Sequence, residues 1–243
     1  MLNLADANRA IARRLAPVNW PVIEHELNEQ GWSTIRGLLK SPECDALVRE
    51  YACDERFRST VDMERYRFGK GQYRYFANPL PPVVTALRRA LYARLQGVAN
   101  VWSSQLARRF VYPATLNGFL GRCHAAKQTR PTPLLLRYRA GDYNCLHQDL
   151  YGALAFPLQT LVLLSQHGQD YEGGEVIFVE QRPRAQSKAV ALTPNRGDAV
   201  IFTNRERPVR GSRGFYAVQM RHGASPLRSG ERFVLGIIFH DAE

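Results

Sequence analysis

Residues 134–149 read LLLRYRAGDYNCLHQD, an apolar run that pauses at the turn Gly141-Asp142 and continues to His147. Further short runs rich in β-branched, aromatic and aliphatic residues follow it, separated by glycine, proline or serine. They lie at 158–165, 174–180, 189–194, 198–203, 215–222 and 232–240. Short strands that recur at this spacing are typical of an antiparallel sandwich or barrel. The chain after residue 130 is therefore expected to form a β structure.

The part before residue 131 has a mainly helical pattern. Residues 1–30 and 82–110 carry apolar side chains at helical spacing, the second stretch as one long helix or two shorter ones. Residues 32–39 are expected to form a short strand before a helix that starts at Ser41-Pro42-Glu43. No flexible linker separates the two parts. We predict one α+β domain, 1–243, in which a mainly helical region, 1–130, packs on a β core, 131–243.

The composition is that of an ordinary soluble globular protein, with 45% apolar and 23% charged residues. No stretch approaches eighteen consecutive apolar residues, and the first residues lack the features of a signal peptide. We therefore predict a cytoplasmic protein with no membrane partner; the composition does not indicate an oligomeric state. The four cysteines form no C-x-x-C pair, which disfavours a zinc site or a disulfide framework.

The formal charge of +11 favours polyanionic partners such as nucleic acid. Residues 65–76, RYRFGKGQYRYF, interleave basic and aromatic side chains, which could hold phosphates and stack on bases. The alternative is a hairpin with one packed aromatic face and one solvated basic face. A second basic group lies at Arg205, Arg207, Arg210 and Arg213, in a stretch expected to be a loop. The candidate substrate residues are Arg65, Tyr66, Arg67, Tyr73, Arg74, Tyr75 and Arg182.

The sharpest local motif is His147-Gln148-Asp149. Residues i and i+2 of a strand share a face, so His147 and Asp149 can reach one ion. A third ligand would complete the 2-His-1-carboxylate triad that leaves positions open for other ligands. A histidine beside a carboxylate is also a common hydrogen-bonded pair. The support comes from His222, at the end of the run 215–222.

Arg232 follows His222 by ten residues and opens the run 232–240. The residues between them include Pro226, Ser229 and Gly230, and we expect them to form a hairpin that places Arg232 on the strand next to His222. A guanidinium there could bind a carboxylate through two parallel hydrogen bonds. Arg228 is a rival anchor but falls in the expected turn. His240-Asp241 is interpreted as a structural pair.

With these residues the chain resembles the Fe(II)/2-oxoglutarate dioxygenase superfamily. The resemblance implies a double-stranded β-helix (jelly-roll) core, with Fe(II) held by His147, Asp149 and His222. It implies that Arg232 binds the co-substrate 2-oxoglutarate, with Tyr138 as a second contact, and that O₂ is the oxidant. Gly173-Gly174-Glu175 before VIFV and Arg196-Gly197-Asp198 before AVIF resemble the turns that lead into core strands of this superfamily.

More narrowly, the chain resembles a bacterial branch of nucleic-acid-acting, AlkB-like oxygenases. The resemblance rests on RPTPLLLRYRAGDYNCLHQDLYG at 130–152, EQRPRAQS at 180–187 and RHG at 221–223 with GIIFHDA at 236–242. It implies oxidative demethylation or modification of a base, as in alkylation repair of DNA. The ten-residue spacing from His222 to Arg232 is instead that of the wider superfamily, which includes hydroxylases of protein side chains, such as prolyl hydroxylases, and of small metabolites. A non-catalytic jelly-roll binding module with a vestigial metal site is the third alternative.

Overall fold

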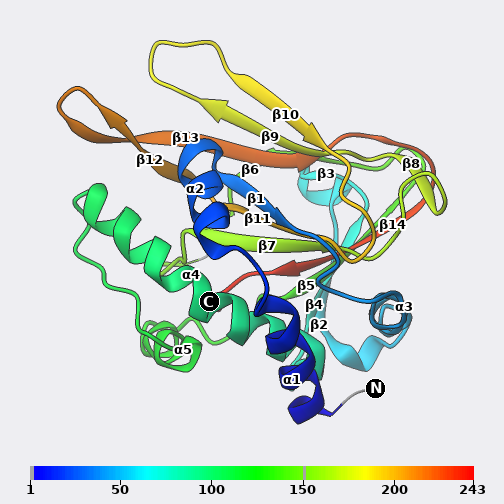
Figure 1. Ribbon diagram of the computed structural model, residues 1–243. Coiled ribbons are helices and arrows are strands. Elements are labelled where there is room, and N and C mark those ends of the chain that lie inside the picture. Colours follow the sequence, from blue (N-terminus) through cyan, green and yellow to red (C-terminus); the bar gives the residue numbers. More distant parts are fainter. Residues whose placement is uncertain (1–2, 150–151) are drawn as a thin grey trace.

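Two antiparallel sheets face each other, and helices cover the outer side of the larger one in this computed structural model, which describes residues 3–149 and 152–243 (Figure 1). The helices are α1 (Leu4–Leu15), α2 (Trp20–Gln30), α3 (Ser41–Glu50), α4 (Pro82–Gln105) and α5 (Leu116–Ala125). None of the helices in the described ranges has the length and hydropathy that a membrane span needs.

The larger sheet has the order β1-β11-β7-β14-β5-β4-β2, and β8 pairs with β14 at its side. Its strands are β1 (Trp32–Ile35), β2 (Phe57–Asp62), β4 (Gln72–Phe76), β5 (Leu134–Arg139), β7 (Leu158–Leu163), β8 (Tyr171–Gly173), β11 (Ala199–Thr203) and β14 (Leu227–Ile237). The smaller sheet has the order β10-β9-β13-β6-β3, with β12 on β13. Its strands are β3 (Gly69–Lys70), β6 (Tyr143–His147), β9 (Val176–Gln181), β10 (Lys188–Leu192), β12 (Glu206–Gly211) and β13 (Gly214–Ala224).

Residues 1–30 form two helices whose ends have clear causes. The side chains of Asn3 and Asn19 accept hydrogen bonds from backbone N–H groups of the first turns of α1 and α2. Gly31 ends α2 in the left-handed conformation, with φ +80°. The apolar stripe of α1, at Ala7 and Ile11, is buried against the core. Residues 82–105 form the single long helix α4.

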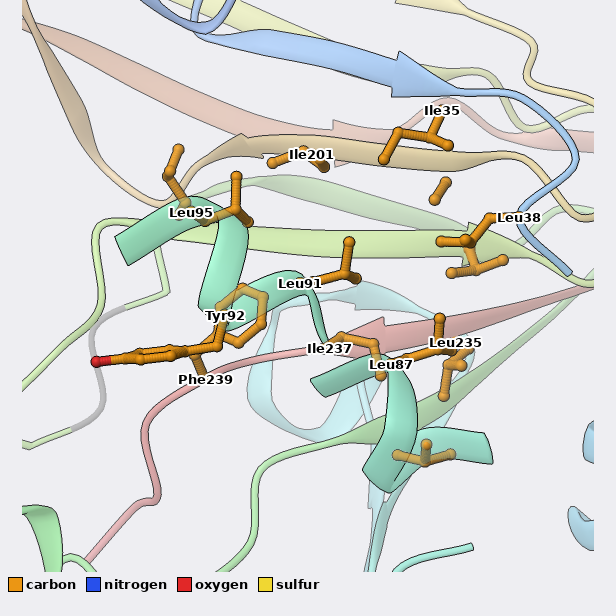
Figure 2. Close-up of a cluster of buried hydrophobic side chains, with 14 of the residues drawn as sticks. Ile35, Leu38, Leu87, Leu91, Tyr92, Leu95, Ile201, Leu235, Ile237 and Phe239 are labelled. Atoms are coloured by element: carbon orange, nitrogen blue, oxygen red, sulfur yellow. The ribbon is translucent and has the colours of Figure 1, made fainter. Parts of the chain in front are cut away.

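The main apolar core lies between α4 and the outer face of the larger sheet. Leu87, Leu91 and Leu95 of α4 are fully buried in this core, and Leu87 and Leu91 point toward Leu235 and Ile237 of β14 (Figure 2). Each such side chain contributes about 1.5–3 kcal/mol when it leaves water. Helices cover the outer face of the larger sheet. Its inner face therefore lines the space between the two sheets.

The β structure draws on both halves of the chain. The region before residue 131 supplies β1, β2 and β4 to the larger sheet and β3 to the smaller one. Residues 57–62 and 72–76 pair as antiparallel strands because both stretches are rich in aromatic and β-branched residues. Residue 130 is thus not a boundary between helices and strands.

Two expectations about the second half were wrong. Residues 206–211 are not a loop but strand β12, paired with β13 in a hairpin. Residues 222–232 are not a hairpin, because β13 belongs to the smaller sheet and β14 to the larger one. The chain crosses between the sheets at Ser225-Pro226, and both strands have irregular pairing beside the crossing.

Candidate active site

Three potential metal ligands meet where β6 and β13 pair. His147 lies directly opposite His222 in the strand register, and Asp149 follows two residues after His147. Asp149 Oδ1 lies 3.4 Å from His147 Nε2, and Asp149 Oδ2 lies 3.2 Å from His222 Nε2. One ligand atom from each residue falls within 4.8 Å of the others. The sequence motif therefore becomes one compact cluster of two imidazoles and a carboxylate.

Neighbouring groups orient these ligands. His147 Nδ1 lies 2.8 Å from the carbonyl oxygen of Cys145, so the N–H at Nδ1 donates and Nε2 keeps its lone pair for a metal. Gln159, a buried residue of β7, donates from Nε2 to Asp149 Oδ2 at 2.8 Å. The sequence reasoning missed Gln159; its one signal is that it is a polar residue within the apolar run 158–165.

The electrostatics keep the Asp149 carboxyl ionised and the His222 imidazole neutral, whereas His147 responds differently: burial alone would lower its pKa, but the hydrogen bond and charge of Asp149 raise it. Burial alone would raise the pKa of the Asp149 carboxyl, but hydrogen bonds and charge from His147 and His222 hold it well below its usual range. Burial lowers the pKa of His222, and the neighbouring His147 lowers it further. An ionised carboxylate and a neutral imidazole are the ligand forms of these side chains. This donor set, two histidines and one carboxylate, fits Fe(II).

Arg232 carries a positive charge into the same interior. It is 2% exposed, its Nε has no hydrogen-bond partner, and it forms no ion pair with the carboxylates of residues 3–149 or 152–243. Its guanidinium lies 5.4 Å from the ring centre of Tyr138 and 5.9 Å from that of Tyr171. A buried cation without a counterion is costly, so this arrangement favours an anionic ligand.

Of the two tyrosines beside Arg232, Tyr138 was expected from the sequence and Tyr171 was not. Tyr138 lies opposite Arg232 in the β5–β14 register, and its hydroxyl accepts a hydrogen bond from Asn144 Nδ2 at 3.3 Å. Burial raises the pKa of Tyr138 to about 12, so the hydroxyl is protonated and able to donate. Tyr171 of β8 was not anticipated, because nothing in the sequence places β8 beside β14.

Gly174 makes room for the arginine. It has φ +62°, and a Cβ atom there would lie 2.4 Å from Leu227 Cδ1 and 3.2 Å from Arg232 Cδ. Any side chain at this position would be strained in its backbone and would press on the chain that carries the guanidinium. The glycine pair before β9 thus has a local function in shaping the site.

The cluster and Arg232 share a cavity of about 460 Å³ between the two sheets. This volume falls within the usual range for small-molecule sites, about 300–1000 Å³. Its walls on the larger sheet are largely apolar and include Leu134, Leu136 and Ile238. Tyr138, Asn144 and Gln159 add polar groups. The cavity combines a metal-binding cluster, a buried cation and apolar walls.

Part of the basic and aromatic segment 65–76 lies at this cavity. Arg67, Phe68 and Tyr73 line it. Tyr66 and Phe68 are 52% and 48% exposed, and their rings stack with centres 5.7 Å apart and planes 20° from parallel. The guanidinium of Arg65 lies 5.8 Å from the ring centre of Tyr66.

The other predicted substrate residues lie elsewhere. Arg74 projects from the opposite face of β4, donating to the Tyr51 carbonyl at 2.7 Å and to Asp54 at 2.6 Å. Tyr75 is buried in a small apolar cluster, with Arg58 over its ring. Arg182 bonds to Glu180 at 2.6 Å on the β9–β10 hairpin and does not line the cavity.

The competing residues have other partners. His240 is fully buried, and its Nδ1 accepts a hydrogen bond from the backbone N–H of Phe156 at 3.2 Å. Asp241 pairs with Arg88 at 2.7 Å. The side chain of Arg228 is 65% exposed and lies 3.5 Å from Glu172. These contacts leave Arg232 as the buried arginine of the cavity.

Comparison with known proteins agrees with this chemistry. Residues 71–242 match the profile of a family described as "Oxygenase, catalysing oxidative methylation of damaged DNA". The chain belongs to this oxygenase family. A protein of Mycobacterium tuberculosis strain H37Rv, named only as uncharacterized, is 51% identical to the oxygenase over 167 residues, 69% of this chain and 72% of that protein.

Solved structures share the fold at low sequence identity. A prolyl-4-hydroxylase from Pseudomonas putida has a TM-score of 0.53 and 16% identity, over 92% of this chain and 99% of that one. An oxidoreductase of the 2OG-Fe(II) oxygenase family from Burkholderia pseudomallei has a TM-score of 0.53 and 14% identity, over 93% of each chain. With the metal cluster and the family match, they identify the oxygenase as a 2-oxoglutarate-dependent non-haem iron dioxygenase, whose cofactors are Fe(II), 2-oxoglutarate and O₂.

Proposed function

We propose that the oxygenase oxidises a C–H bond of an alkyl group on a nucleic-acid base, so that an N-methyl group is lost as formaldehyde. In this proposal His147, Asp149 and His222 hold Fe(II), which activates O₂ together with 2-oxoglutarate. Arg232 receives the far carboxylate of 2-oxoglutarate, and Tyr138 lies beside it as a second donor. The two facing sheets form the double-stranded β-helix of the superfamily, within one domain spanning residues 1–243.

The observation that carries the choice of substrate is the exposed aromatic pair at the cavity. Tyr66 and Phe68 are stacked on each other, about half exposed, and Phe68 lines the same cavity as the metal cluster. Bases stack on such rings with about 1–3 kcal/mol each. Arg67, in the left-handed conformation with φ +59°, also lines this cavity and can reach a phosphate. The family description and the charge of +11 agree with a nucleic-acid substrate.

A protein side chain is the second candidate substrate. It is favoured by the ten residues from His222 to Arg232, the spacing expected in the wider superfamily, and by the shared fold with a prolyl-4-hydroxylase. A peptide has no bases to stack on the aromatic pair and no phosphates for the basic residues beside it. The two candidates therefore differ in how turnover depends on Tyr66 and Phe68.

The test is succinate and formaldehyde release by protein loaded anaerobically with Fe(II), on admission of O₂, with methylated single-stranded DNA or with proline-containing peptides. The double variant Tyr66→Ala, Phe68→Ala is compared with Val101→Ala, Val111→Ala, which removes exposed apolar side chains from elsewhere. We expect DNA-stimulated formaldehyde that falls at least tenfold in the first variant alone. Turnover stimulated by peptide and unchanged by DNA would replace the base with a protein substrate. His147→Ala sets the metal-free baseline.

A further inference from the structure

Two hairpins extend from the end of the smaller sheet, away from the metal cluster. One joins β9 to β10 and the other joins β12 to β13; both project at the same end of the molecule (Figure 1). They adjoin each other, because β13 pairs with β9 up to Gln219 and Gln181 and continues outward paired with β12. The outer part of β13 therefore lies beside both β12 and the β9–β10 hairpin.

The acidic groups on these hairpins are already neutralised. Glu180 bonds to Arg182 and to the buried Arg207, each at 2.6 Å. Glu206 pairs with Arg108 and accepts a hydrogen bond from Gln219. What remains is a set of exposed basic side chains that form no ion pair with any residue of the described ranges. We call this set the hairpin surface: Arg184, Lys188, Arg205, Arg210, Arg213 and Arg221.

Aromatic rings stand among these charges. Phe215 and Tyr216 are 40% and 37% exposed. Phe215 lies opposite Arg210 in the β12–β13 register, so both side chains stand on one face. Arg221 is six residues beyond Phe215 on the same strand and therefore shares that face, while the next residue, His222, turns into the cavity. Arg210, Arg221 and the ring of Phe215 thus stand on the face of the smaller sheet opposite to the side chain of His222.

We propose that the hairpin surface binds the phosphate backbone of single-stranded nucleic acid and holds the strand whose base enters the cavity. This inference rests on the proposed function. Arg213 directly precedes β13 and lies nine residue steps before His222, about 30 Å at roughly 3.4 Å per residue. A strand stacked as in duplex DNA rises about 3.4 Å per nucleotide, so that span corresponds to about nine nucleotides of such a strand. The oxygenase therefore recognises a polymer through contacts that a short oligonucleotide cannot reach.

The test measures DNA affinity of the intact protein by fluorescence anisotropy between 50 and 200 mM salt, with an unmethylated 20-nucleotide strand and a trinucleotide. The variant Arg210→Glu, Arg213→Glu is compared with Arg13→Glu, Arg89→Glu, which makes the same charge change at exposed, unpaired arginines of α1 and α4. Circular dichroism and thermal unfolding establish that both variants are folded.

Each phosphate contact on a single strand contributes about 0.7 to the slope of log affinity against log salt. Losing two contacts should lower that slope by about 1.4, so the wild type loses about sevenfold more affinity than the hairpin variant across the fourfold salt range. The hairpin variant should bind the 20-nucleotide strand at least tenfold more weakly than the control variant at 50 mM salt, and the trinucleotide should show no such difference.

Two outcomes would overturn the inference. Equal affinity of the two variants for the 20-nucleotide strand would exclude the hairpin surface as a DNA-binding site, even if methylated DNA still stimulates turnover. A hairpin variant that loses binding to vesicles of anionic lipid while keeping its DNA affinity would assign the surface to a membrane. Failure of the proposed function has a different signature: methylated DNA leaves formaldehyde release unchanged in the wild type itself.

Discussion

The substitution Arg232→Met tests whether a buried arginine is kept for an anionic ligand. Arg232 is 2% exposed, its Nε has no hydrogen-bond partner, and its guanidinium lies 5.4 and 5.9 Å from the ring centres of Tyr138 and Tyr171. Methionine is of similar length and carries no charge. Because replacing a buried charge by a packed apolar group is often stabilising, we expect the free energy of unfolding without 2-oxoglutarate to rise by about 1 kcal/mol or more.

The same substitution should weaken the binding of 2-oxoglutarate steeply. Removing one partner of a buried, hydrogen-bonded charge pair costs about 2–5 kcal/mol. At about 1.4 kcal/mol per tenfold, the KM for 2-oxoglutarate should rise by about 30-fold to 4000-fold. Fe(II) affinity should stay within about threefold, because the three proposed ligands, His147, Asp149 and His222, are untouched.

The assay is urea unfolding under anaerobic conditions, with and without 2-oxoglutarate, together with the KM from succinate release. Arg228→Met is the matched control, since Arg228 lies on the same strand with its side chain 65% exposed beside Glu172. Exposed pairs of this kind contribute about 0–1 kcal/mol, so the control should change neither quantity much. A lower stability of Arg232→Met without 2-oxoglutarate, together with an unchanged KM, would refute the reasoning.

Three further predictions concern residues around the site. Gln159→Leu removes the hydrogen bond that orients Asp149 and should lower Fe(II) affinity about 10- to 100-fold; an unchanged Fe(II) titration would contradict this. Gly174→Ala should lower the thermal midpoint and raise the KM for 2-oxoglutarate. Gly168→Ala, with φ +80° but no atom within 4 Å of the added Cβ, should lower the midpoint alone. Burial lowers the pKa of His240 from 6.5 to about 4. As the pH falls, this histidine therefore binds its proton at a higher pH in the unfolded chain than in the folded one. The free energy of unfolding should then drop by about 3 kcal/mol between pH 6.5 and 4, and His240→Asn, measured by urea titration, should lack that drop.

The cluster of His147, Asp149 and His222 was predictable because the position of each residue depends on local geometry. The period of two along a strand places His147 and Asp149 on the same side, and the run 215–222 places His222 at the inner face of its own strand. The contact of Gln159 with Asp149 depends instead on how the two sheets face each other. Its hydrogen bond to Asp149 requires that β7 of the larger sheet face β6 of the smaller one across the cavity, and no spacing in the sequence specifies which strands face each other.

The segment 65–76 shows a second feature that the sequence pattern does not specify, namely which face of a strand meets the cavity. Alternate residues of β4 point to opposite faces, so Tyr73 lines the cavity and Arg74 does not. A pattern of alternating aromatic and basic residues predicts that one set is buried and the other solvated, but both sets remain candidates for a substrate until the neighbouring strands are known. Arg74 in fact stacks on Phe57, 4.3 Å from its ring centre, on the side away from the metal cluster.

Arg232 and His222 line the same cavity although no hairpin joins their strands. Ten residues limit how far two side chains can separate, but they do not decide whether the strands lie in one sheet or in two facing ones. Here the chain crosses at Ser225-Pro226, where irregular pairing in both strands lets it change sheets. Facing sheets bring inward side chains together across their shared interior, as neighbouring strands would. The facing arrangement has one consequence that a hairpin lacks: it leaves a cavity that both Arg232 and the cluster of His147, Asp149 and His222 line, and this cavity is where we propose that 2-oxoglutarate binds.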